Sequence, residues 1–233
     1  MTAWLTPEEW QAVRLSLSVA TRSVVLGLPP AVLVAFVLAR CRFPGRALLD
    51  ALVHLPLVLP PVVVGWLLLV TFGLRGPVGS LLHEWFGIRL VFTTEGAALA
   101  TAVMSFPLIV RAVRLSIEGV DPGLEAAART LGAGPLDRFA TVTLPLVAPG
   151  ILAGAVTAFA AGLGEFGAVI TFASNIPGET QTLPLAIYSA TQTPGGEGAA
   201  ARLALVSFLL AVAGLLLAEV IARRLGRLLG RAA

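Results

Sequence analysis

Residues 121–145 read DPGLEAAARTLGAGPLDRFATVTLP and form the longest polar stretch in an otherwise apolar chain. Asp121 is a typical helix-capping residue, and Pro122 suits the first helical position because it lacks a backbone N–H. The alanines that follow have the highest helix propensity, and Gly132 suits the left-handed conformation that often ends a helix. The stretch therefore predicts a helix of about ten residues, followed by a turn at Gly134 and Pro135.

A helix this short is marginal in water unless it packs against something else. Its small alanine side chains allow a close approach, as when a helix binds in a groove. Two interpretations stay open from these residues alone. The stretch is either a surface that a partner binds or an ordinary loop folded on its own chain.

The composition indicates a membrane protein, since 57% of the 233 residues are hydrophobic and only 12% are charged. Apolar runs near the length of a bilayer crossing recur along the chain, whereas a transmembrane barrel would show short alternating segments. We therefore predict an all-α membrane protein with about five transmembrane helices. We expect one membrane domain over residues 1–233, with a polar segment at about 119–145.

Each span is expected where a long apolar run lies between polar or basic residues. Thr6, Pro7 and the two glutamates that follow mark the start of the first helix. The expected spans are residues 7–39, 48–74, 96–117, 146–172 and 201–221, with a short helix or re-entrant piece at 183–190. Residues 75–95 are expected to form a polar loop.

Prolines mark one candidate for the wall of a transport pathway. Residues 51–74 carry no charged side chain over 24 residues, long enough to cross a bilayer with some tilt. Pro56, Pro60 and Pro61 must disrupt the first half of this span. Broken backbone is tolerated in a membrane only where protein or a cavity satisfies the freed groups. Pro60 and Pro61 therefore indicate either a pathway wall or a kinked packing helix.

The second candidate is the run Gly164-Glu165-Phe166-Gly167 in the fourth span. An ionisable residue inside a membrane is expensive and is functional by default. We expect Glu165 to pair with an arginine or to hold a glycine-flanked helix break at a gate; a purely structural role stays open. A remote alternative is an intramembrane enzyme that uses Glu165, but no second acid or histidine is evident at a matching depth.

Nothing in the chain predicts a cofactor, a metal site or a nucleic-acid surface. Cys41 is the only cysteine, and neither His54 nor His83 has a partner at metal-ligand spacing. All sixteen cationic residues are arginines, and they are scattered among the membrane spans rather than gathered in a patch.

The arginines predict the orientation, because cytoplasmic loops carry an excess of positive charge. With five spans, one side of the membrane receives eleven arginines, namely Arg40, Arg42, Arg46, Arg111, Arg114, Arg129, Arg138, Arg223, Arg224, Arg227 and Arg231. The other side receives five, namely Arg14, Arg22, Arg75, Arg89 and Arg202. We therefore expect the N-terminus outside and the C-terminus in the cytoplasm.

The stretch 121–145 resembles the cytoplasmic signature of ABC importer permeases, E-A-A-x3-G-x9-I-x-L-P. With Gly132 as the anchor, Ala127-Ala128, Val142 and Leu144-Pro145 fall in register. One position departs, because Ala126 stands where the signature has glutamate and the acid, Glu125, lies one residue earlier. The resemblance implies that residues 119–145, here called the coupling segment, contact an ATPase. The implied contact residues are Glu125, Ala126, Ala127, Ala128, Arg129, Thr130, Gly132, Ala133 and Gly134.

The similarity extends over nearly the whole chain. RCRFPGRALLD, AVMSFPLIVRAVR, LGEFGAVITFASNIPGET and QTPGGEGAARL are among the segments that resemble the molybdate permease family of bacterial ABC importers. The resemblance implies a bacterial inner-membrane location and a pathway formed with a second copy. It also implies a dimer of cytoplasmic ATP-binding subunits and a periplasmic molybdate-binding protein as partners.

Two consequences follow from that resemblance. The chain has no G-x-x-x-x-G-K-[ST] sequence and no lysine, which agrees with ATP hydrolysis in a separate subunit. A dianionic substrate would be repelled by a bare carboxylate, so Glu165 is not expected to bind it directly. Tungstate and sulfate remain alternative substrates.

Overall fold

The computed structural model describes residues 4–228, and this part of the chain is helical throughout, with no strand. The elements, in chain order, are α1 (Pro7–Arg40), α2 (Arg46–Val58), α3 (Pro61–Phe72), α4 (Pro77–Phe86), α5 (Thr94–Glu118), α6 (Pro122–Thr130), α7 (Pro135–Arg138), the π-helical turn η1 (Phe139–Thr143), α8 (Leu144–Leu163), α9 (Gly167–Phe172), α10 (Leu183–Thr191) and α11 (Glu197–Leu228).

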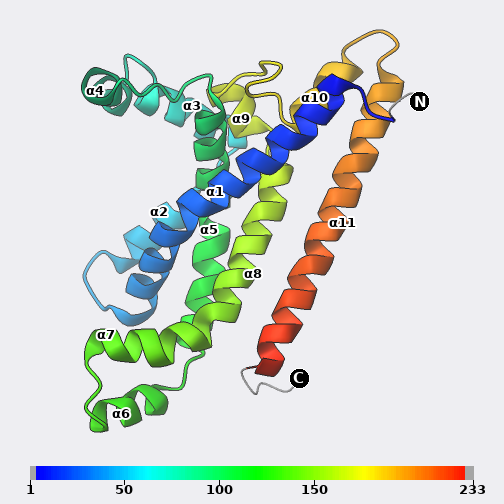
Figure 1. The fold of residues 1–233 in the computed structure, drawn as a ribbon. Helices are drawn as coiled ribbons and strands as arrows, with labels where there is room; N and C mark the ends of the chain where they lie inside the picture. Colours follow the sequence, from blue (N-terminus) through cyan, green and yellow to red (C-terminus); the bar gives the residue numbers. More distant parts are fainter. Residues whose placement is uncertain (1–3, 229–233) are drawn as a thin grey trace.

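Four long helices, α1, α5, α8 and α11, run along the length of the molecule (Figure 1). The short helices gather at its two ends. We call one end the α6 end, where α6 and α7 lie, and the other the α4 end, where α3, α4, α9 and α10 lie. The connection between α1 and α2 lies toward the α6 end.

The described residues contain four helical stretches that are long and apolar enough to cross a membrane: Pro7–Arg40, Thr94–Glu118, Pro135–Leu163 and Glu197–Leu217. The pair α2 and α3 makes a fifth candidate, bent by 115° at its break. The predicted all-α architecture with about five spans is therefore confirmed.

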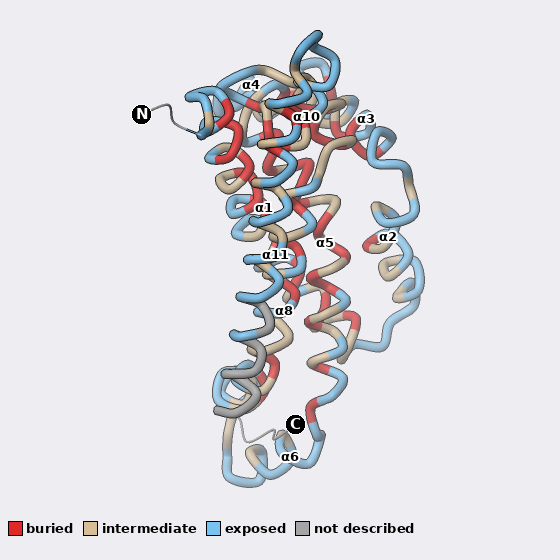
Figure 2. Tube along the Cα trace, turned by 90° about the vertical axis from the view of Figure 1, so that its right-hand side faces the viewer, coloured by how far each residue is buried: buried red, intermediate tan, exposed pale blue. Residues whose placement is uncertain are grey.

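Helix α5 is the centre of the bundle and packs against both α1 and α8. Figure 2 shows buried residues along α5 and the adjoining face of α1, whereas α11 is mostly exposed. Glycines on α8 allow α8 to approach α5 closely. A Cβ atom added at Gly154 would lie 3.2 Å from the Cβ of Ala112, and one at Gly162 would lie 2.8 Å from Cγ2 of Thr101. Small residues at such contacts are typical of packing between membrane helices.

The start of α1 agrees with the sequence prediction and also ties α1 to α11. The hydroxyl of Thr6 accepts the backbone N–H of Glu9, and the Glu9 carboxylate accepts the N–H of Thr6 at 2.8 Å. The same carboxylate accepts a hydrogen bond from Arg202 of α11 at 2.6 Å. This capping box therefore joins two long helices at the α4 end.

The second span differs from the expected tilted crossing. Helix α2 ends at Val58, and α3 begins at Pro61 after the sharp bend. Pro60 and Pro61 end the first helix because proline lacks a backbone N–H and restricts the residue before it. Among the residues of α2, Val53 alone is buried, and Arg114 of α5 forms an ion pair with Asp50 at 3.0 Å.

The expected polar loop at 75–95 contains helix α4, so that prediction was wrong. Pro77 occupies the first turn of α4, and Gly87, at φ +67°, ends it in the left-handed conformation. Glycine and proline flank this segment, and both residues favour a loop. These same residues are the start and stop signals of a short helix.

The fourth span is also shorter than predicted, since α8 ends at Leu163 and does not reach Phe172. Residues 164–166 interrupt the helix, and α9 starts at Gly167. The Glu165 carboxylate accepts the backbone N–H of Ala168 at 2.9 Å, which satisfies one free donor at the start of α9.

Candidate functional site

Helix α6 has the boundaries that its sequence predicts. The Asp121 side chain accepts the N–H of Gly123 at 2.8 Å. At the other end, the N–H of Ala133 bonds to the carbonyl of Ala128, and that of Gly132 bonds to the carbonyl of Arg129. With Gly132 at φ +87°, these two bonds form a Schellman motif. The helix has nine residues and is followed by a sharp turn into α7.

Glu125 fastens α6 to the rest of the chain. Its Oε1 atom accepts a hydrogen bond from Nη2 of Arg40 at 2.7 Å and another from the hydroxyl of Thr143 at 2.9 Å. Arg40 is the last residue of α1, and Thr143 is the last residue of η1, directly before α8. Phe36 of α1 also packs edge-on against Phe139 at 5.5 Å between ring centroids. Glu125 therefore attaches α6 to the end of α1 and to the residue directly before α8.

The rest of α6 and its turn faces away from the chain. No residue of α6 or α7 is buried. Leu131 and Leu136 are 88% and 84% exposed, although both are large apolar side chains. Figure 1 shows α6 and α7 projecting beyond the bundle at this end. Exposed apolar residues on a projecting polar segment make this surface a candidate for contact with a partner.

The two predicted pathway regions lie in contact at the α4 end. Helices α3 and α9 pack together, and a Cβ atom added at Gly167 would lie 2.7 Å from the Cβ of Pro61. A Cβ at Gly65 would meet the carbonyl oxygen of Ala168 at the same distance. The break after α2 and the break after α8 therefore meet through glycine and proline, with backbone against backbone.

One of the two expectations was that Glu165 pairs with an arginine. Among the described residues it forms no such ion pair. The structure instead places its carboxylate at the break, on the backbone of Ala168. Phe166 turns toward α10 and contacts Tyr188 at 5.4 Å between ring centroids. Glu165 therefore lies at a glycine-flanked helix break, and its expected role at a gate stays a prediction.

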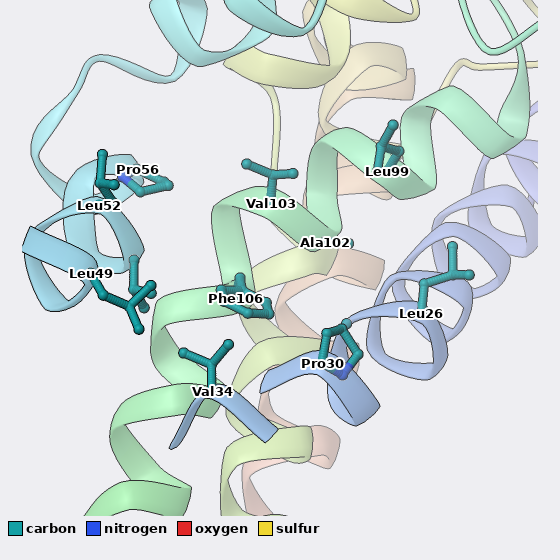
Figure 3. A pocket seen from close by; sticks show the side chains of 12 residues that line it. Leu26, Pro30, Val34, Leu49, Leu52, Pro56, Leu99, Ala102, Val103 and Phe106 are labelled. Atoms are coloured by element: carbon teal, nitrogen blue, oxygen red, sulfur yellow. The ribbon is translucent and has the colours of Figure 1, made fainter. Parts of the chain in front are cut away.

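A cavity of about 510 Å³ lies between α1, α2 and α5 (Figure 3). Its lining is apolar, with Leu26, Pro30, Leu52 and Phe106 among the side chains that point into it. An oxyanion needs hydrogen-bond donors or cations, so this cavity is not suited to bind one. Within residues 4–228, no group of three or more histidines, cysteines or acids is placed to hold a metal ion.

Sequence reasoning missed Leu131 and Leu136 as candidate contact residues. A leucine in an amphipathic stretch is usually buried, and only the position of α6 outside the bundle exposes these two. The signal was present but ambiguous: the coupling segment is too polar to bury much surface, and its leucines flank glycine and proline.

These features define a helical, multi-span membrane protein of the transporter class, with a projecting segment fastened to two of its spans. The chain belongs to the family described as "Binding-protein-dependent transport system inner membrane component", which it matches over residues 27–227. It is therefore a multi-pass inner-membrane protein and a transport subunit rather than an enzyme.

Individual relatives are close. The chain is 61% identical over 219 residues to the molybdenum transport system permease protein ModB of Escherichia coli (strain K12), covering 94% of this chain and 96% of that protein. It is 54% identical over 223 residues to ModB of Haemophilus influenzae, covering 96% and 97%.

A solved structure of similar fold is a bacterial alginate ABC transporter in complex with an alginate pentasaccharide-bound periplasmic protein. The TM-score is 0.76 at 19% identity, and the match covers 96% of this chain and 81% of that one. This likeness confirms the importer permease fold.

Proposed function

We propose that this chain is the membrane-spanning subunit of an ATP-driven importer for molybdate. It forms one domain over residues 1–233, with the coupling segment at 119–145 as its contact with a separate ATP-hydrolysing subunit. The single observation that carries the coupling role is the link from the projecting α6, through Glu125, to Arg40 of α1 and Thr143 of η1. The 61% identity to a molybdenum permease supports the substrate.

The geometry suggests how a movement driven by ATP hydrolysis is transmitted to the pathway residues. A partner that closes on ATP displaces α6, and the displacement passes through Glu125 to the ends of α1 and α8. Helix α8 runs the length of the bundle and ends at the break held by Glu165. Because Gly167 and Pro61 touch there, a shift of α8 also moves the start of α3.

The residues that we propose for the coupling and pathway roles are those predicted from the sequence. The coupling contacts are Glu125, Ala126, Ala127, Ala128, Arg129, Thr130, Gly132, Ala133 and Gly134, to which we add Leu131 and Leu136. The pathway or gate residues are Pro60, Pro61, Gly164, Glu165, Phe166 and Gly167.

We infer that the working unit contains a second copy of this chain, a dimer of cytoplasmic ATP-binding subunits and a periplasmic molybdate-binding protein. The two breaks form only one side of a pathway, and a second copy would supply the other. The α6 end faces the cytoplasm in this proposal. The arginines of the α1–α2 connection and of the coupling segment support that orientation, with the N-terminus outside.

The substrate itself is tested by competition. The assembled importer in vesicles, with its binding protein supplied outside, is expected to take up molybdate when ATP is enclosed. Tungstate and sulfate are tetrahedral dianions like molybdate and are the alternative substrates. Sulfate that competes as well as unlabelled molybdate would contradict the molybdate assignment, whereas uptake without ATP would contradict the coupling.

The coupling surface is tested by Leu131→Ser and Leu136→Ser. Both side chains are almost fully exposed in the isolated chain, so these variants are expected to fold normally but to bind the ATP-hydrolysing subunit more weakly. Leu74→Ser is the matched control, since Leu74 is exposed at the opposite end. Co-purification of the partner subunit is the measurement. Equal retention by all three variants would show that the coupling segment is not the docking surface.

A further inference from the structure

Helix α4 carries an apolar face of which the described part of the chain covers only Leu82 in part. At 100° per residue, Val78, Leu81 and Trp85 fall on one side of this helix, whereas Ser80, His83 and Glu84 fall on the other. The apolar side faces outward: Leu81 is 49% exposed and Trp85 is 74% exposed. Phe86 and Ile88, which continue this surface, are also exposed.

The position of α4 explains why its own chain leaves this face open. Its main packing partner is α3, and it lies at the edge of the fold in Figure 1. Gly79 is the buried residue of the helix, and it packs against the backbone of Phe72 and Gly73 at the end of α3. Contact through a glycine holds the helix close to α3, while Leu81, Trp85 and Phe86 stay exposed.

The tryptophans of the chain gather at the same end. The sequence holds four, and each is more than half exposed: Trp4 just before α1, Trp10 near its start, Trp66 in α3 and Trp85 in α4. The start of α1 and both short helices lie at the α4 end (Figure 1). Tryptophan is enriched where the hydrocarbon of a bilayer meets the headgroups, because its ring is apolar and its N–H needs a polar partner.

Two exposed arginines stand on either side of α4. Arg75 precedes the helix and Arg89 follows it, and neither takes part in an ion pair among the described residues. Guanidinium groups bind phosphate well, so both suit a lipid headgroup beside an apolar face that enters the bilayer.

We propose that α4 is an interfacial helix. It lies in the plane of the membrane at the α4 end, with Val78, Leu81 and Trp85 in the lipid and with Arg75 and Arg89 at the phosphates. It thereby holds α3 at a defined depth in the membrane. The contact between Pro61 and Gly167 is held at a defined depth together with α3. The surface is a lipid-binding one, distinct from the coupling segment at the opposite end.

Spin labelling of the full-length chain tests this proposal. Cys41 is the only cysteine, so Cys41→Ser provides a background for one labelled position at a time. Leu81→Cys places a nitroxide on the apolar face and leaves Trp85 intact, and His83→Cys places one on the polar face as a matched control. The chain is reconstituted in vesicles of phosphatidylethanolamine and phosphatidylglycerol. Collision rates with lipid-soluble oxygen and with a water-soluble nickel chelate are then measured.

The label at Leu81→Cys is expected to collide more often with oxygen than with nickel, and the label at His83→Cys more often with nickel. Frequent nickel collisions at both positions would mean that α4 lies in water and would overturn the proposal. An immobilised label at Leu81→Cys with little access to either reagent would also overturn it. Such a result would show that a second copy of the chain, rather than lipid, covers this face.

Discussion

Glu125 is the residue on which the coupling segment depends most directly. Its carboxylate is partly buried and joins Arg40 to Thr143, so Glu125→Gln removes an ion pair and weakens the attachment of α6 to two helices. Disrupting a charged hydrogen bond of this kind costs roughly 1–3 kcal/mol. We expect fewer molybdate ions transported per ATP hydrolysed, while the partner subunit stays bound.

Asp137→Asn is the matched control for Glu125→Gln. It removes the same charge from the same segment, but the Asp137 side chain is exposed and makes no hydrogen bond within residues 4–228. If both variants lowered the transport ratio equally, the loss would reflect segment charge rather than the attachment through Arg40.

Gly167 tests the contact between the two helix breaks. In Gly167→Ala the new methyl group meets Pro61 at 2.7 Å, and such overpacking typically costs about 1–3 kcal/mol. Gly164→Ala is the control, because its nearest atom is the carbonyl oxygen of Ala161 at 3.7 Å. Thermal unfolding in detergent is expected to show a lower midpoint for Gly167→Ala alone. Equal midpoints would mean that the α3–α9 contact relaxes freely.

At the scale of the element, the end of α6 depends on a single left-handed residue. Gly132 lies at φ +87° with open space around it, so Gly132→Ala adds conformational strain of roughly 1–2 kcal/mol without a clash. Gly134→Ala, also in open space but at φ −68°, adds none of this strain. We expect Gly132→Ala to unwind the last turn of α6 and to reduce ATP-driven uptake. Equal uptake by the two variants would contradict a role for the Schellman motif.

The helix breaks show where element boundaries were predictable. The prolines at 56, 60 and 61 predict an interruption of the helix, and the structure has one. The 115° change of direction, however, depends on what α3 packs against. The break at Gly164 and Glu165 was one of the open interpretations of the sequence, because these residues alone are also compatible with a continuing helix. The contact of α9 with α3 favours the break.

For the whole molecule, orientation is the main expectation that an experiment can settle. Cys41 is exposed at the α6 end, just after α1. A membrane-impermeant thiol reagent is expected to label it only after the membrane is permeabilised, because we place this end in the cytoplasm.

Gln192→Cys in a Cys41→Ser background provides the opposite case. Position 192 is exposed in the connection between α10 and α11, at the α4 end, and is expected to react in intact cells. Labelling of Cys41 without permeabilisation, together with protection at position 192, would reverse the proposed orientation.

The sequence by itself determined the class, the positions of α1, α5 and α11, the bounds of α6 and the family. These features rest on local chemistry: apolar length sets the spans, and Asp121, Pro122 and Gly132 set the ends of a helix wherever it lies. Tertiary structure alone decided that Glu125 holds Arg40 and Thr143, that Gly167 touches Pro61, and that α4 turns its apolar face outward. Each of these depends on segments far apart in the chain, and neither spacing nor propensity specifies which of them meet.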